Sequence, residues 1–388
     1  MGTLTIIKRN MRSYGMFIAL LAVMLFFTLT TEGLFMTARN LSNLFDQTGY
    51  VAVLAIGMTL ILIDLQIDLS VGYVCGFIGA IVAQIMRVAP GVPVVVLVLA
   101  AMVIGILVGA YQGFLVAKCE VPPFVVTLAG MFIFRGALLL VTGSTGTIII
   151  KNETFNALGN GFIPDIGGEH DIHILTMILG ILLVGCLIGS EIKARANKAK
   201  YGLSDTPKTL FIAKLFFIAV LILFFTTKLA QYHGLSWTIV IVLVVLGIYH
   251  FITNNTVLGR HIYAVGGNRE AAQLSGIKVE KILMFVFCNM GMLAGLAGVL
   301  FAARLQSATP TAGNAFEMDA IASSYVGGTS ASGGVGKVTG TMIGALVMSS
   351  LTNGMNLMNV GISYQYIVRG AVLIAAVLFD VRARRVKI

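Results

Sequence analysis

Residues 93–117 read PVVVLVLAAMVIGILVGAYQGFLVA, a run of 25 residues without a single charge. As a helix this run would be about 37 Å long, more than the roughly 30 Å thickness of the hydrocarbon core of a bilayer. Long uncharged apolar runs are typical of transmembrane helices, whereas helices of soluble proteins alternate apolar and polar faces. The stretch therefore predicts a membrane-spanning helix.

Composition extends this prediction to the rest of the chain. Of the 388 residues, 58% are apolar and 11% are charged, whereas soluble domains contain about 25% charged residues. We predict an all-α polytopic membrane protein, a helix bundle of about twelve spans forming one domain over 1–388. The spans are expected near 14–31, 48–64, 71–86, 93–117, 122–142, 173–190, 211–228, 237–253, 282–303, 316–330, 338–354 and 364–380. The 316–330 segment is short, and a re-entrant helix is the alternative there.

Glycines recur at intervals of four residues within several predicted spans. Gly105, Gly109 and Gly113 form one such stripe, and the ranges 291–295 and 340–344 begin and end with glycine in the same way. Small residues at this spacing let two helix backbones approach closely in lipid. These stripes predict helix-packing faces. Packing within one chain is the favoured interpretation, and a seam between two copies is the alternative.

The distribution of basic residues predicts the orientation of the chain. If the N-terminus is cytoplasmic, 19 of the 26 Lys and Arg residues fall on cytoplasmic segments and five fall outside. Cytoplasmic loops of membrane proteins carry such an excess. We therefore predict that both termini are cytoplasmic. The net charge of +10 is then explained by topology and by contact with lipid headgroups, and nucleic acid binding is not expected.

The predicted cytoplasmic segment 254–281 contains a candidate docking helix. Asn268 is a suitable N-cap, Glu270 lies in the first turn, and Gly276 suits a left-handed helix stop. The helix would be about 10 Å long, too short to cross a membrane. Ala271 and Ala272 give it a low profile, so that another protein could approach its backbone closely.

Three motifs resemble one family of transport proteins. The stretch GNREAAQLSG at 267–276 resembles the E-A-A…G coupling loop of permeases of binding-protein-dependent ABC importers. IDLSVG at 67–72, and PTAG at 310–313 followed by EMDAIA and GGTS at 317–322 and 327–330, resemble the ribose/xylose/galactose branch. The resemblance implies that an ATPase subunit is coupled through Gly267, Asn268, Glu270, Ala271, Ala272 and Gly276.

The layout resembles the longer members of that branch. Short members have ten spans, and this chain adds a predicted helical pair at 173–228, as xylose-type and multiple-sugar permeases do. The resemblance implies a permease of the bacterial inner membrane that imports xylose or a related pentose or hexose. It further implies three partners: a cytoplasmic ATPase subunit, an extracytoplasmic sugar-binding protein and a second copy of the permease. A branched-chain amino-acid ABC permease is the nearest alternative, and an ion-coupled secondary transporter is a more distant one.

No catalytic or metal site is predicted in this chain. The glycine-rich stretch at 333–338 lacks the residues of a nucleotide-binding phosphate loop, since Ala331 and Val338 stand where Gly and Ser or Thr are required. ATP and Mg²⁺ are therefore expected on the partner ATPase, with no cofactor here. The four cysteines are far apart, and the histidines show no ligand spacing.

Polar residues within the spans are candidates for the translocation path. Charges in mid-membrane need a partner or water, so Arg135 and Arg369 either form buried pairs or reach the membrane surface by snorkelling, or else they line the path. Uncharged polar groups suit a neutral substrate, and the candidates for the path are Arg135, Asn289, Asn353 and Gln365. Glu317 and Asp319 either dock the binding protein or cap the short helix that follows.

Overall fold

The computed structural model describes residues 3–143, 146–166, 172–200 and 208–385. By their contacts these residues form two compact units. The first comprises 1–35, 44–161 and 238–388, and the second comprises 36–43 and 162–237. Both are helical, which confirms the predicted all-α membrane class; the two-residue strands β1 (Ile148–Ile149) and β2 (Ser307–Ala308) pair antiparallel in the first unit.

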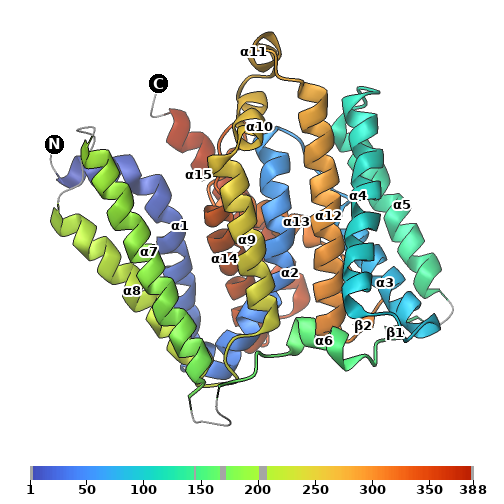
Figure 1. Ribbon diagram of the computed structural model, residues 1–388, viewed down its shortest axis with the longest axis horizontal. Helices are drawn as coiled ribbons and strands as arrows, with labels where there is room; N and C mark the ends of the chain where they lie inside the picture. The colour runs from blue at the N-terminus through green and yellow to red at the C-terminus, as the bar shows by residue number, and fades with distance from the viewer. Residues whose placement is uncertain (1–2, 144–145, 167–171, 201–207, 386–388) are drawn as a thin grey trace. The chain divides into compact units, whose positions relative to one another are not determined.

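The helices of the first unit include most of the predicted spans (Figure 1). They are α1 (Thr3–Thr30), η1 (Leu34–Met36), α2 (Ala38–Ile63), α3 (Val71–Val88), α4 (Val94–Ala117), α5 (Pro123–Thr142), α6 (Glu153–Asn160), α9 (Trp237–Asn255), α10 (Val257–Gly267), α11 (Arg269–Leu274), α12 (Val279–Leu305), α13 (Phe316–Val326), α14 (Val338–Leu357) and α15 (Ile362–Arg385). The last residue of η1, the start of α2 and the first residue of α9 are assigned to the second unit.

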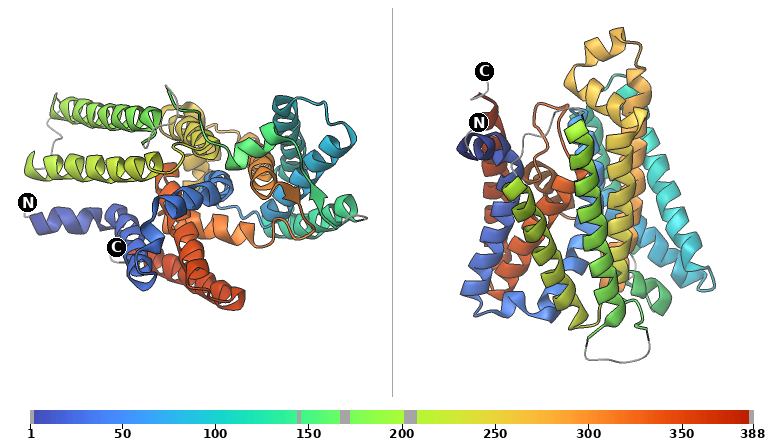
Figure 2. Two further views of the ribbon diagram at one scale, coloured as in Figure 1. Left: turned by 90° about the horizontal axis from the view of Figure 1, so that it is seen from below. Right: turned by 60° about the vertical axis from the view of Figure 1, so that its left-hand side comes forward.

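The second unit contains α7 (Ile174–Lys200) and α8 (Lys208–Ala230), which run side by side (Figure 2). Asp165 accepts hydrogen bonds from the backbone N–H groups of Ile174 and Leu175, both at 2.8 Å, and so caps the start of α7. Lys214 of α8 pairs with Glu191 of α7 at 2.7 Å. These helices occupy the stretch 173–228, and the idea that it is an insertion into a ten-span core stays a prediction.

Nine helices among the described residues are long and apolar enough to cross a membrane. The predicted count of twelve is therefore not confirmed. The three other predicted spans correspond to α1, α13 and α14, of which α13 has only 11 residues. A helix of that length measures about 16 Å and cannot cross a bilayer by itself. The re-entrant alternative for 316–330 fits this length.

The core of the first unit is built around α12, which packs along α4 (Figure 1). The contact uses the predicted glycine stripes: a β-carbon built on Gly105 would lie 2.7 Å from the carbonyl carbon of Gly291, and one on Gly295 would lie 2.8 Å from that of Ala101. On another side of α12, Gly298 meets α3 near Gly79. The stripes at 105–113 and 291–295 thus pack against each other within one chain, as the favoured interpretation predicted.

Polar side chains join α2, α13 and α14 in the same core. The Thr59 hydroxyl lies 2.6 Å from the Thr341 hydroxyl and donates to that of Ser324 at 3.1 Å. All three residues are fully buried. Buried hydroxyls in membrane helices need such partners because lipid offers none. Gly327 and Gly340 are also in close contact, so that α13 is held tightly between its neighbours.

Candidate functional site

One candidate site is the arm formed by α10 and α11, which extends beyond the ends of α9 and α12 (Figure 1). Thr256 caps α10 by accepting a hydrogen bond from the N–H of Gly259 at 3.1 Å. Asn268 ends α10 and begins α11, where its side-chain oxygen accepts from the N–H of Ala271 at 2.9 Å. The predicted N-cap is therefore present. The helix α10 was not predicted within the segment 254–281.

The end of α11 also matches the sequence prediction. Gly276 has φ +83°, in the left-handed region, and its N–H donates to the carbonyl of Gln273 at 2.9 Å. The N–H of Ile277 donates to the carbonyl of Ala272 at 3.1 Å, which completes a Schellman-type stop. Glu270 and Ala271 are exposed, whereas Ala272 is buried. Leu274 is 90% exposed, and an apolar side chain so exposed on a protruding helix is a candidate contact for a partner.

Backbone contacts hold the arm against the rest of the first unit. We call the residues that make them the glycine junction: Ile63, Gly266, Gly333 and Gly334. The N–H of Gly334 donates to the carbonyl of Ile63 at 2.8 Å. A β-carbon on Gly334 would lie 2.7 Å from the Cα of Gly267, and one on Gly266 would lie 2.7 Å from the carbonyl carbon of Ile63. Only glycine allows such approach. The stretch at 333–338 that fails as a phosphate loop thus packs against the arm.

Two further side chains, those of Tyr263 and Asp64, belong to residues beside this junction. The hydroxyl of Tyr263 in α10 donates to the carbonyl of Gly336 at 2.8 Å. Asp64 follows α2, and neither of its carboxylate oxygens has a hydrogen-bond partner among the described residues. Burial raises the pKa of Asp64 to about 8, although Arg269 acts in the opposite direction. The carboxyl group is therefore mainly protonated at neutral pH.

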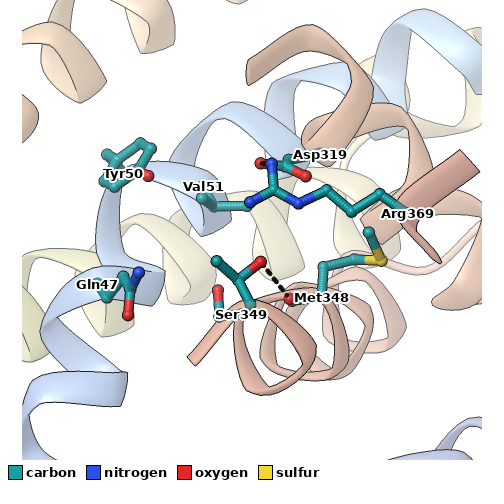
Figure 3. Close-up of a pocket in the computed structure, with 8 residues that line it drawn as sticks. Gln47, Tyr50, Val51, Asp319, Met348, Ser349 and Arg369 are labelled. Atoms are coloured by element: carbon teal, nitrogen blue, oxygen red, sulfur yellow. Dashed lines mark hydrogen bonds and ion pairs between the residues drawn. The ribbon is translucent and has the colours of Figure 1, made fainter. Parts of the chain in front are cut away.

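A second candidate site is a cavity within the first unit between α2, α13, α14 and α15 (Figure 3). Its empty volume, which includes the open space at its mouth, is about 270 Å³. Most of the side chains that line it carry hydrogen-bonding groups. The lining residues are Gln47, Tyr50, Val51, Asp319, Met348, Ser349, Thr352 and Arg369. We refer to it as the polar cavity.

An ion pair crosses one wall of the polar cavity. Nη1 of Arg369 in α15 lies 3.1 Å from Oδ2 of Asp319 in α13. The other carboxylate oxygen, Oδ1 of Asp319, and Nε of Arg369 are buried and have no hydrogen-bond partner among the described residues. Figure 3 shows the guanidinium group lying against the carboxylate at the cavity. Arg369 thus has the buried partner that one of the two sequence interpretations required.

The other predicted path residues lie elsewhere. Arg135 is exposed on α5, with its guanidinium 5.7 Å from the centre of the Tyr73 ring. Asn289 of α12 is buried and accepts a hydrogen bond from Tyr249 of α9. The amide of Gln365 donates to Asn356 at 2.8 Å, and Asn353 is buried in α14. None of the four lines the polar cavity, and their role in translocation stays a prediction.

The two acids proposed to dock a binding protein are both buried. Glu317 is 7% exposed and Asp319 is 8% exposed. Glu317 lies against Gly72 at the start of α3, and its Oε2 has no hydrogen-bond partner among the described residues. Neither carboxylate is a surface group in this conformation. Both lie in the first turn of α13, where a helix favours negative charge.

Sequence reasoning missed most of the polar cavity. Tyr50 and Thr352 lie within predicted spans and Gln47 lies just before one, in helices that carry several other polar residues, so the sequence does not single them out. A polar residue on the inward face of a span is a signal for a site, but a sequence does not show which face is inward. Among the described residues there is also no group of His, Cys, Asp or Glu that could hold a metal ion.

Comparison with known proteins places the chain in a family. The model of the family described as "Branched-chain amino acid transport system / permease component" matches residues 40–377. The xylose transport system permease protein of Escherichia coli K12 is 39% identical over 376 residues, which is 97% of this chain and 93% of that protein. The corresponding protein of Haemophilus influenzae is 39% identical over 96% of both chains. The ribose import permease protein of E. coli K12 is 35% identical over 89% of this chain and 87% of that protein.

No solved structure matches the chain significantly. The match to the family model covers most of the sequence, and the similarity to the permeases extends over nearly the full length of both chains. The helical membrane architecture agrees with that assignment. The chain belongs to the family of permease components of branched-chain amino acid transport systems and their relatives.

Proposed function

We propose that this chain is the membrane-embedded permease of an ATP-driven importer of monosaccharides, with xylose or a related pentose or hexose as its substrate. Permeases named for xylose and for ribose are 39% and 35% identical to it over most of its length. The proposed complex contains two copies of this chain, a cytoplasmic ATPase subunit and an extracytoplasmic sugar-binding protein. The membrane is the bacterial inner membrane, with both termini of the chain in the cytoplasm.

The observation that carries the coupling to an ATPase is the α10–α11 arm. It combines a capped six-residue helix, a left-handed stop at Gly276 and the exposed side chain of Leu274. A six-residue helix is about 9 Å long and would not be stable by itself, so its caps matter to its shape. We propose that the exposed face of α11 fits a groove on the ATPase subunit, and that the glycine junction passes the movement of the arm to the membrane helices.

The test is co-purification of the ATPase with variants of the arm, together with sugar uptake by proteoliposomes holding the full complex. Leu274→Ser removes the exposed apolar contact and changes no internal one, so we expect loss of the ATPase from the complex and loss of uptake. Glu270→Ala changes helix stability by only about 0.3–1 kcal/mol, so a large loss of association would reflect lost docking contacts.

Asn268 offers a matched control. Asn268→Ala removes the cap at a cost of about 1 kcal/mol, whereas Asn268→Ser retains a capping oxygen. We expect the Ala variant to bind the ATPase more weakly and the Ser variant to bind it nearly as well as the unchanged chain. If Leu274→Ser and Gly276→Val both kept full uptake and full ATPase content, the arm would not be the coupling element.

The description of the family favours a second candidate, import of a branched-chain amino acid. Uptake of labelled xylose, arabinose, galactose and leucine by the same proteoliposomes separates the two. We expect uptake of at least one sugar and none of leucine. Leucine uptake without sugar uptake would refute the sugar proposal.

A further inference from the structure

The polar cavity has the chemistry of a ligand site. It is bounded by four helices of the first unit, and six of its eight lining residues carry a hydrogen-bonding side chain. Such a cluster is costly among apolar helices and is usually functional. Among the six are an amide, three hydroxyls and the ion pair between Asp319 and Arg369. Together they offer both donors and acceptors toward one small volume.

The unpaired atoms of the ion pair indicate what kind of group would fit. Oδ1 of Asp319 is an acceptor and Nε–H of Arg369 is a donor, and both are buried without a partner among the described residues. Asp319 is 8% exposed. A buried polar atom without a hydrogen bond is costly, so a ligand that satisfies both atoms gains that free energy. A hydroxyl group does both, because it can donate to the carboxylate and accept from the guanidinium.

The charge balance of the cavity disfavours an ionic ligand. The carboxylate of Asp319 and the guanidinium of Arg369 already neutralise each other at 3.1 Å. An anion or a zwitterion would have to separate this pair to reach either charge. The only purely hydrocarbon lining residue is Val51, and Met348 is the only other apolar one, so an aliphatic amino-acid side chain would find little to pack against. A neutral molecule with several hydroxyl groups meets neither obstacle.

One wall of the cavity is rigid. The ring of Tyr50 is packed 5.0 Å from that of Phe301 and 4.8 Å from that of Phe316, measured between ring centres. A ring held in this way loses little freedom when a ligand binds. It presents a flat face, against which the C–H groups of a sugar ring can pack, and a hydroxyl that can bond to it.

We propose that the polar cavity is a polyol-binding subsite, in which Asp319 and Arg369 bind neighbouring hydroxyl groups of a monosaccharide beside Tyr50, Ser349 and Thr352. The proposal rests on the proposed function, because it gives the imported sugar a place within the permease. Binding there has to be weak, since an importer must release its substrate, and individual hydrogen bonds that exchange with water meet this requirement.

The first test asks whether a sugar occupies the cavity. Ser349→Cys places a thiol in the cavity, and Ser350→Cys places one next to it on α14 but outside the cavity lining. Both are made in the full complex after replacement of Cys119, Cys186 and Cys288, and a small water-soluble thiol reagent is applied with the binding protein and xylose or leucine. We expect xylose to slow the modification of Ser349→Cys and leucine to leave it unchanged. The modification of Ser350→Cys should not respond to either.

The second test measures uptake. Thr352→Val and Thr48→Val each remove a hydroxyl that bonds to the carbonyl four residues earlier, and only Thr352 lines the cavity. We expect the Thr352 variant to lower the uptake rate roughly two- to tenfold, the worth of one hydrogen bond. Thr48→Val should transport as the unchanged chain does. Asp319→Asn should lower uptake and weaken the protection of Ser349→Cys by xylose.

The outcomes separate this proposal from the proposed function. If the unchanged complex imports xylose while xylose gives no protection and Thr352→Val and Asp319→Asn transport normally, the subsite is refuted and the importer stands. If the complex imports leucine instead, the proposed function fails. Protection of Ser349→Cys by leucine would then overturn the polyol assignment as well. Protection by xylose together with impaired uptake by Thr352→Val supports the subsite.

Discussion

The close contact at the glycine junction leads to a prediction that does not depend on the transport assay. Gly266→Ala adds one methyl group where α10 meets the end of α2. That β-carbon would lie 2.7 Å from the carbonyl carbon of Ile63 and 3.1 Å from the Cα of Asp64, whereas ordinary van der Waals contact begins at 3.4 Å. The carbonyl oxygen of Ile63 would lie closer still, so the two backbones must separate by more than the roughly 0.7 Å that the carbonyl carbon alone requires. The neighbours are main-chain atoms, so no side chain can rotate away.

The expected cost follows from the contacts that this separation disturbs. Overpacking of a close contact costs about 1–3 kcal/mol. The hydrogen bond from the N–H of Gly334 to the carbonyl of Ile63 would be stretched, and its net worth is about 0.5–1.5 kcal/mol. Against this, replacing a helical glycine by alanine stabilises the helix by up to about 1 kcal/mol. With the full helix-propensity gain subtracted, we expect a net destabilisation of about 0.5–3.5 kcal/mol.

Gly267→Ala is the matched control, because it adds the same methyl group one residue later in the same helix and meets nothing within 4 Å. The assay is thermal unfolding of the purified chain in detergent, read as the midpoint at a fixed heating rate. We expect the Gly266 variant to unfold several degrees lower and the Gly267 variant to unfold at or above the temperature of the unchanged chain. Equal midpoints for the two variants would refute the close approach of α10 to Ile63.

Three further predictions concern packing, pH and topology. Gly105→Ala should destabilise the chain because its β-carbon would lie 2.7 Å from the carbonyl carbon of Gly291 in α12 and nearer still to the carbonyl oxygen. Gly136→Ala in α5 meets nothing within 4 Å and should be neutral or stabilising in the same unfolding assay. Burial raises the pKa of Asp64 from 3.8 to about 8, so the folded chain holds a proton that the unfolded chain releases. The free energy of unfolding should therefore fall as pH rises between those values, and Asp64→Asn should flatten a pH series of midpoints. The predicted orientation places residues 191–210 in the cytoplasm, so single cysteines there should resist an impermeant thiol reagent in intact cells; labelling from outside would reverse the predicted topology.

Local features of the fold were predictable because they depend on neighbouring residues. Asn268 and Gly276 have the side chain and the backbone freedom that their cap positions require, and both occur where the sequence placed them. The stripes at 105–113 and 291–295 were likewise recognisable from their spacing. The helix α10 was missed because its glycines lower helix propensity, and in the structure Gly266 is required by contact with Ile63, which is 203 residues away in the sequence.

The polar cavity could not be predicted for a related reason. Asp319 and Arg369 were both recognised as candidates, but their pairing joins residues 50 positions apart on helices whose relative rotation no local pattern specifies. Asn289 is the opposite case. As a polar residue in a predicted span it was a candidate for the translocation path, and the structure shows that it accepts a hydrogen bond from Tyr249, which joins α12 to α9. Polarity in a span indicates that a partner exists, and only the fold identifies the partner.

The shortness of α13 has a consequence for how the protein is made. Its 11 residues include two acids and two buried serines, so this segment has neither the length nor the apolarity that would keep it in lipid by itself. It can be stable at membrane depth only when protein already surrounds it. The contacts of α13 with α3 and of Ser324 with α2 come from spans made early in synthesis, but those with α14 and α15 come from the end of the chain. The first unit is therefore completed only after α14 and α15 have been inserted, and the early spans have to remain accessible to them until then.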